Sequence, residues 1–103
     1  MTLAEIYNDG LFIAQINFII GRVYNLKEEY ETSIYFHEKH LNLARQFQDS
    51  KGQCQAYFIL SQLYEKINQN DKAKKYLSLS KALAREVKKE ILLKNYLFFV
   101  TLD

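Results

Sequence analysis

Residues 18–44 read FIIGRVYNLKEEYETSIYFHEKHLNLA, and residues 58–84 read FILSQLYEKINQNDKAKKYLSLSKALA. The two stretches are offset by 40 residues, and apolar, small and aromatic side chains return at the same places, beginning with Phe18 and Phe58. A shorter echo follows at residues 98–100, which read FFV. A fixed period between 20 and 50 residues is typical of stacked structural repeats. This period, rather than any local motif, predicts the fold.

The composition is typical of a helical globular chain. Of 103 residues, 49% are hydrophobic and 25% charged, which is too apolar for a disordered chain. The absence of Pro and the presence of only three Gly favour helices joined by short turns. A single Cys excludes an internal disulfide and is typical of a reducing compartment, so we expect a cytoplasmic protein. We expect no membrane partner, because the longest apolar runs are far shorter than the roughly 20 residues of a membrane span.

The hydrophobic periodicity divides each unit into two helices. Apolar residues recur at spacings of three and four, which places them on one helix face, and short polar links separate the helices. The sequence Asn8-Asp9-Gly10 is a turn signal. The predicted organisation is a single array with a partial helix over residues 2–8, a repeat over 11–48, a repeat over 51–89 and a terminal helix over 91–102.

Small residues recur where the two helices of a unit are expected to cross. In each unit a small residue precedes an aromatic by three positions, and a second small residue follows the aromatic by nine. These residues are Gly21, Tyr24 and Ser33 in the first unit, and Ser61, Tyr64 and Ala73 in the second. Two small side chains facing each other allow the helices to approach closely, and the aromatic fills the space beside them.

The stretch 21–47 (GRVYNLKEEYETSIYFHEKHLNLARQF) resembles the 40-residue tetratricopeptide repeat (TPR) variant of the Pins/LGN and Tonsoku-like scaffold proteins. The run Tyr35 to Leu41, followed by Leu43-Ala44, is similar to their second helices. The resemblance covers nearly the whole chain. It implies an all-α fold of antiparallel helix hairpins stacked as a right-handed TPR superhelix, an α-solenoid. It also implies that the first helix of each hairpin lines a concave face.

Few residues suggest chemistry. His37 and His40 lie three apart on one helix, but a zinc site needs further ligands, and the chain has one Cys, Cys54, and no other His. Cys54 also lacks a His-Asp context for a nucleophile. No Gly-rich phosphate loop and no hydrolase motif occurs. We therefore expect no enzyme activity, no metal and no cofactor.

The function that remains is protein binding. The side chains expected to face the concave groove come from the first helix of each hairpin and from the terminal helix: Gln15, Phe18, Ile19, Arg22, Gln55, Phe58, Ile59, Gln62, Asn95, Phe98 and Phe99. An apolar groove of this kind fits a partner peptide or an amphipathic helix. The competing interpretation is that the apolar members are core residues, since large apolar side chains are usually buried.

The charged residues are unevenly distributed along the chain. Residues 1–70 carry six Lys and Arg and eight Asp and Glu, a net charge of −2. Residues 71–103 carry eight Lys and Arg and four Asp and Glu, a net charge of +4. Such charges usually form a solvated helix face, so we expect no nucleic-acid partner.

The alternative to a peptide-binding scaffold is a regulatory or oligomerisation segment of a larger signalling protein, which self-associates through its terminal helix.

Overall fold

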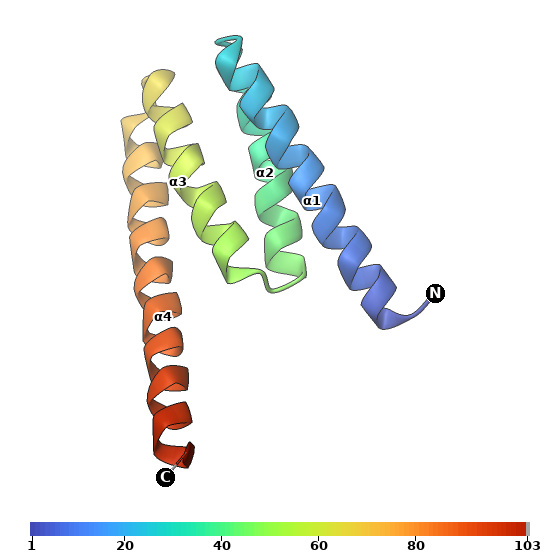
Figure 1. Cartoon of the computed structure of the whole chain (residues 1–103). Helices are drawn as coiled ribbons and strands as arrows, with labels where there is room; N and C mark the ends of the chain where they lie inside the picture. Colours follow the sequence, from blue (N-terminus) through green and yellow to red (C-terminus); the bar gives the residue numbers. More distant parts are fainter. Residues whose placement is uncertain (103) are drawn as a thin grey trace.

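The structure is a computed structural model, and it describes the backbone of residues 1–102 and the side chains of residues 1–98. Its helices are α1 (Leu3–Leu26), α2 (Tyr30–Gln46), α3 (Ser50–Lys66) and α4 (Asn70–Leu102). Each helix packs antiparallel against the next one along the chain (Figure 1). No strand occurs within residues 1–102. The expected all-α class, built from sequential helix hairpins, is confirmed.

The three turns share one geometry. In the first, the Glu29 amide donates to the Tyr24 carbonyl at 2.9 Å, and the Glu28 amide donates to the Asn25 carbonyl at 3.0 Å. This pair of hydrogen bonds defines a Schellman motif, which needs one residue in the left-handed conformation. That residue has φ values of 61°, 55° and 63° in the three turns, at Glu28, Gln48 and Asn68. The turns are therefore spaced at half the sequence period.

Replacing Gln48 with Gly is expected to stabilise the fold. A left-handed backbone costs an L-residue roughly 1–2 kcal/mol, while Gly adopts it freely but loses more chain entropy on folding. Gln48→Gly should therefore raise the free energy of unfolding by about 0.5–1 kcal/mol. Asn68→Gly should change it less, because Asn tolerates this conformation. Urea unfolding measures both, and a less stable Gln48→Gly variant would contradict the turn geometry.

The predicted close crossing of α1 and α2 is confirmed at Gly21. The Ser33 hydroxyl donates to the Gly21 carbonyl at 2.6 Å, which requires the two helices to touch. A Cβ atom at Gly21 would lie 2.6 Å from His37 Nε2, inside van der Waals contact. In the second unit, Ser61 and Ala73 are both buried and line the same small cavity between α3 and α4. Small residues therefore occupy the crossing in both hairpins.

The core lies between α2, α3 and α4, and a shared carboxylate joins these three helices. Glu38 of α2 accepts hydrogen bonds from the hydroxyls of Tyr64 of α3 and Tyr76 of α4, each at 3.1 Å. Burial and then the Glu38 carboxylate raise the pKa of Tyr64 to about 12, so its hydroxyl remains a donor at neutral pH. The buried apolar residues around this network are Ile34, Leu41, Ala56, Tyr57, Leu60, Leu63, Tyr64 and Ala73.

The expected break after residues 2–8 is wrong, because α1 continues through Asn8-Asp9-Gly10. Thr2 starts this helix with a capping box, in which its hydroxyl accepts from the Glu5 amide at 3.1 Å. Gly10 is buried inside the helix, and a Cβ atom there would collide with the Phe47 ring. The glycine therefore gives Phe47 room to pack rather than making a turn. The predicted partial helix and the first helix of the 11–48 repeat are one element.

The expected terminal helix over residues 91–102 is also not a separate element, because α4 runs without a break from Asn70 to Leu102. The previous turn depends on Gln48 and on Asp49, whose carboxylate caps α3 by accepting from the Gly52 amide at 3.0 Å. The equivalent residues 87–90, Val-Lys-Lys-Glu, include no capping Ser, Thr, Asp or Asn. The helix therefore continues, and its end projects beyond the α2–α3 turn (Figure 1).

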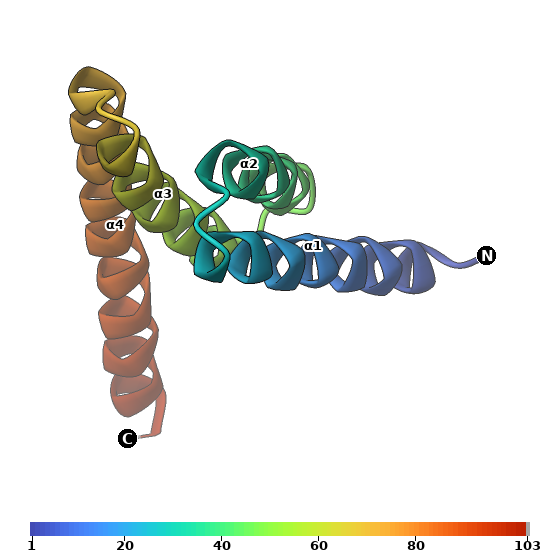
Figure 2. The ribbon, with the colours of Figure 1, turned by 90° about the horizontal axis from the view of Figure 1, so that it is seen from above.

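The dense apolar sequence of α1 is buried on one face only. Its buried residues are Gly10, Ala14 and Gly21, which lie toward α2. Other apolar side chains of α1 remain in solvent, since Phe12 is 64% exposed and Ile13 is 50% exposed. Seen from above, α1 and α4 lie on two sides of the molecule, with α3 between them and α2 beside α1 (Figure 2).

Candidate binding surfaces

A first groove, here called the α1–α3 groove, has a volume of about 440 Å³. Its lining comes from α1, α2, the second turn and α3: Leu11, Ala14, Gln15, Phe18, His40, Asp49, Lys51, Gly52 and Gln55. Phe18 is half-buried, with its ring centroid 5.6 Å from that of His37 and 5.3 Å from that of His40. The Arg22 guanidinium lies 5.8 Å from the centre of the same ring.

The structure gathers several of the predicted groove residues. Gln15 and Phe18 of α1 line the α1–α3 groove together with Gln55 of α3. Ile19 is 55% exposed on α1, and Phe58 is 47% exposed on α3. The remaining members on these helices divide into two kinds: Arg22 and Gln62 are exposed, whereas Ile59 is half-buried and packs against the core. For Ile59 the core interpretation is therefore the better one.

The histidine pair is buried beneath this groove. His37 is fully buried, and neither of its ring nitrogens has a hydrogen-bond partner. Burial, followed by the neighbouring His40 and Arg22, lowers the pKa of His37 to about 4, so the ring is neutral at pH 7. Burial also lowers the pKa of His40, against an opposing effect of Asp49. Among the described residues, no cluster of three or more His, Cys, Asp or Glu side chains is placed to hold a metal ion.

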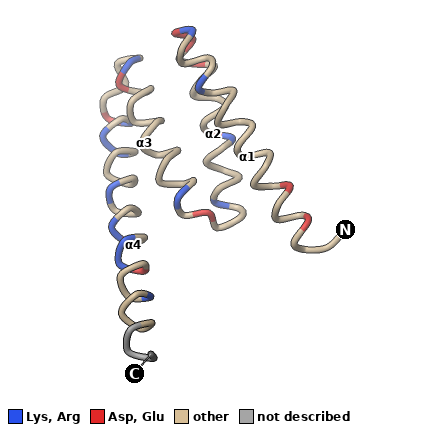
Figure 3. Tube along the Cα trace, viewed as in Figure 1, with Lys and Arg blue, Asp and Glu red and all other residues tan. Residues whose placement is uncertain are grey.

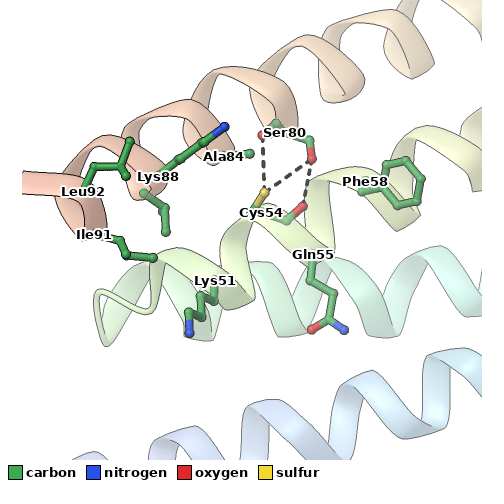
Figure 4. A pocket seen from close by; sticks show the side chains of 10 residues that line it. Lys51, Cys54, Gln55, Phe58, Ser80, Ala84, Lys88, Ile91 and Leu92 are labelled. Carbon is green, nitrogen blue, oxygen red and sulfur yellow. Dashed lines mark hydrogen bonds between the residues drawn. The ribbon is translucent and has the colours of Figure 1, made fainter. Parts of the chain in front are cut away.

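A second groove, here called the α3–α4 groove, has a volume of about 660 Å³ (Figure 4). It is lined by Lys51, Cys54, Gln55 and Phe58 of α3 and by Ser80, Ala84, Val87, Lys88, Ile91 and Leu92 of α4. Hydrogen bonds between the two helices close its floor, where the Cys54 thiol donates to the Ser80 carbonyl at 3.3 Å and the Ser80 hydroxyl donates to the Cys54 carbonyl at 3.0 Å. Among the described residues, its charged lining residues are Lys51 and Lys88.

The predicted groove residues of the terminal helix that the structure describes, Asn95 and Phe98, line neither groove. Asn95 and Phe98 are exposed on the part of α4 beyond Leu92, and the side chain of Phe99 lies outside the described residues. Because α4 does not turn back after residue 89, Ile91 and Leu92 instead line the groove with Phe58. The α4 wall of this groove was missed from sequence, since none of its residues was among the side chains expected to face a groove. Residues that are 40 positions apart have different neighbours here, and only the structure shows this difference.

Basic side chains extend along α4 (Figure 3). Lys72 packs on an aromatic ring, with its ammonium 5.2 Å from the centre of the Tyr64 ring. Near the end of the helix the Lys89 ammonium pairs with the Glu86 carboxylate at 3.5 Å, where both side chains are mostly exposed. An exposed pair of this kind contributes little stability. The positive charge of residues 71–103 therefore lies on the solvent side of α4 and at the rim of the α3–α4 groove.

None of the described helices is long and apolar enough to span a membrane. Comparison with known proteins adds no relative: no protein-family model, no curated protein and no solved structure matches the chain. The chain is a small all-helical domain of four sequentially packed antiparallel helices, with two grooves that its repeat relates to each other.

Proposed function

We propose that this chain is a protein-interaction module of the TPR type, which binds a partner peptide or helix along the α1–α3 face. One observation carries this proposal: Ile19 and Phe58 are about half exposed on neighbouring first helices of the two hairpins. Exposed apolar side chains that gather on one face are typical of interaction sites. The hairpin pattern, the matching turns and the small residues at the helix crossings are consistent with a TPR-type assignment.

The polar residues around these anchors indicate what the partner carries. The amides of Gln15, Gln55 and Gln62 both donate and accept hydrogen bonds, so they suit the backbone of a bound peptide. Arg22 and Lys51 supply positive charge at the same face, while the carboxylate of Asp49 is engaged in capping α3. A ligand with apolar residues flanked by Asp or Glu fits this arrangement best.

Substitution of Ile19 tests the face directly. Peptides selected from a random display library against the full chain should bind with measurable affinity in isothermal titration or fluorescence anisotropy. Ile19→Glu should weaken the selected peptide more than tenfold, because it places a carboxylate within an apolar contact. The helix content should be unchanged in circular dichroism, since Ile19 is 55% exposed.

Ile13→Glu is the matched control. Ile13 has nearly the same exposure, 50%, on the same helix, but six residues away it faces a different direction. Peptide affinity should change less than twofold in this variant. Failure to select any peptide, or equal losses in the two variants, would refute the proposed binding face.

A further inference from the structure

The two grooves are the same feature of successive units. The wall that α1 and α2 give to the α1–α3 groove consists of Leu11, Ala14, Gln15, Phe18 and His40. Forty residues later stand Lys51, Cys54, Gln55, Phe58 and Ser80, and all five line the α3–α4 groove. In the first unit α3 supplies the opposite side. In the second unit α4 runs straight on, so the described chain places no following helix there.

The burial of two equivalent alanines shows the consequence. Ala44 of α2 is fully buried, and a Cβ atom at Gly52 of α3 would lie 3.3 Å from its methyl group. Ala84 of α4 is the same residue type at the same place in the next unit, and it is exposed. The difference is the covering helix, which Ala44 has and Ala84 lacks. The α3–α4 groove is therefore built to receive a helix like α3.

Helix α1 has the sequence and the exposed face of such a helix. Residues 11–22 align with residues 51–62 of α3 at the same offset of 40. Phe12 and Ile16 correspond to Gly52 and Ala56, which α3 buries, yet they are 64% and 39% exposed. We propose that α1 of one copy docks in the α3–α4 groove of a second copy, so that copies join head to tail. The contact goes beyond that function, and its groove shares Phe58 with the proposed peptide site.

The contacts between α2 and α3 fix the register of this docking. Gln53 Nε2 donates to the Ala44 carbonyl at 3.4 Å, and the equivalent pair across two copies is Ile13 with Ala84. Arg45 donates to the Tyr57 hydroxyl at 2.7 Å, and the equivalent pair is Arg85 with Asn17. The Asn17 amide nitrogen donates to the Ile13 carbonyl at 2.9 Å, which leaves its oxygen as an acceptor for Arg85.

Charge favours this pairing over the docking of two α4 ends. One helical turn beyond Ile13 and Ala84, the same antiparallel register brings Asp9 opposite Lys88. Between residues 1 and 21 the charged side chains are Glu5 and Asp9, both acidic, whereas the α3–α4 groove is rimmed by lysines. Figure 3 shows the acidic start of α1 and the basic length of α4. Opposite charges across an interface speed association and fix its register.

The volumes of the facing side chains also change in compensating directions. Relative to the α2–α3 contact, the docking helix gains volume at two places, with Phe12 in place of Gly52 and Ile16 in place of Ala56. The receiving wall loses volume with Ser80 in place of His40. Lys81 stands where Leu41 is buried, and its stem covers apolar surface while its amine reaches solvent.

The area is that of a stable interface. The exposed apolar side chains that the docking covers are Ile6, Phe12, Ile13 and Ile16 on one copy and Phe58, Ile91, Leu92 and Tyr96 on the other, each between 39% and 65% exposed. At about 100 Å² each they remove about 800 Å² of apolar surface, which is roughly 60% of a typical interface and implies a total near 1,300 Å². Stable interfaces bury about 1,200–2,000 Å² in total.

Cysteine cross-linking in the full chain tests the register. In a Cys54→Ser background, Ile13→Cys and Ala84→Cys are made singly and together. Both positions are exposed, and their helices are not packed against each other in one copy. After oxidation with copper phenanthroline, the double variant should give a covalent ladder of multiples of 12.2 kDa on a denaturing gel. An equal mixture of the single variants should stop at the dimer, and each single variant alone should remain monomeric, because a head-to-tail contact joins two different surfaces.

A Leu93→Cys/Ala84→Cys variant in the same background represents the pairing of two α4 ends, since Leu93 follows Gln53 by 40 residues. The proposal is overturned if Leu93→Cys/Ala84→Cys cross-links and Ile13→Cys/Ala84→Cys does not. It is also overturned if neither double variant cross-links. Light scattering provides a measurement without engineered cysteines. The average mass of the unmodified chain should rise above 12.2 kDa as its concentration increases from about 10 to about 300 μM, and Ile13→Glu should return it to the monomer mass. A constant monomer mass for the unmodified chain also overturns it. Because Ile13→Glu is expected to change peptide affinity less than twofold, its loss of self-association separates this result from the peptide experiment.

Discussion

Gly21→Leu should destabilise the domain by about 1–3 kcal/mol, because it forces a side chain into a close contact between α1 and α2. The Cβ atom alone would lie 2.6 Å from His37 Nε2, and the Ser33–Gly21 hydrogen bond holds the two backbones at this distance. Leu is about 1 kcal/mol better than Gly as a helix former, so any loss measures the collision rather than helix propensity. Urea unfolding followed by circular dichroism gives the free energy.

A double-mutant cycle identifies the residue with which the new side chain collides. His37→Ala alone should cost stability by leaving a cavity, yet in the Gly21→Leu background it removes the ring that Leu would strike. The two substitutions together should therefore cost about 1–3 kcal/mol less than the sum of the single changes. Thr32→Leu, at an exposed position of α2, serves as the control and should be nearly neutral. Additive losses at Gly21 and His37 would contradict the packing described here.

Lowering the pH from 7.5 to 5 should destabilise the domain by about 2 kcal/mol through His37. Its pKa is about 4 in the folded chain and 6.5 in the unfolded chain, so the unfolded state takes up the proton first as the pH falls. The contribution of the neutral ring is therefore complete above about pH 6.5 and is lost progressively toward pH 4. Urea unfolding at half-unit intervals of pH measures this slope.

His37→Leu is the informative variant, because Leu77 occupies the equivalent position of the second unit. The variant should lose most of the slope between pH 7.5 and 5 and keep the smaller part that His40 contributes, since burial lowers its pKa as well. An unchanged slope in His37→Leu would mean that another group controls the acid sensitivity. Keeping the lowest pH at 5 limits the contribution of the carboxylates, which titrate mostly below it.

Much of the fold followed from the sequence, because its determinants are local or strictly periodic. The 40-residue period predicted two equivalent hairpins, and the small residues at Gly21 and Ser33 predicted where the helices of the first one cross. Polar links predicted the three turns near residues 28, 48 and 68. These features depend on side-chain size and on helix spacing, both of which can be read from neighbouring residues.

The two ends of the chain show what the sequence did not determine. Asn8-Asp9-Gly10 has the composition of a turn, but packing of Gly10 against Phe47, 37 residues away, keeps it helical. Residues 87–90 lack the cap that Asp49 supplies, and α4 therefore continues past the place where the period predicted a turn. Helix α1 likewise leaves Phe12 and Ile13 exposed, although large apolar side chains are usually buried.

The candidate sites divide in the same way. The sequence by itself determined the helical class and the repeat, and it predicted a common face for α1 and α3. Only the tertiary structure decided that Ile59 belongs to the core, that Asn95 and Phe98 lie beyond both grooves, and that Ala84 is exposed where Ala44 is buried. The physical reason is that two identical residues at equivalent repeat positions can differ in whether a neighbouring helix covers them. The local sequence pattern does not encode that neighbour.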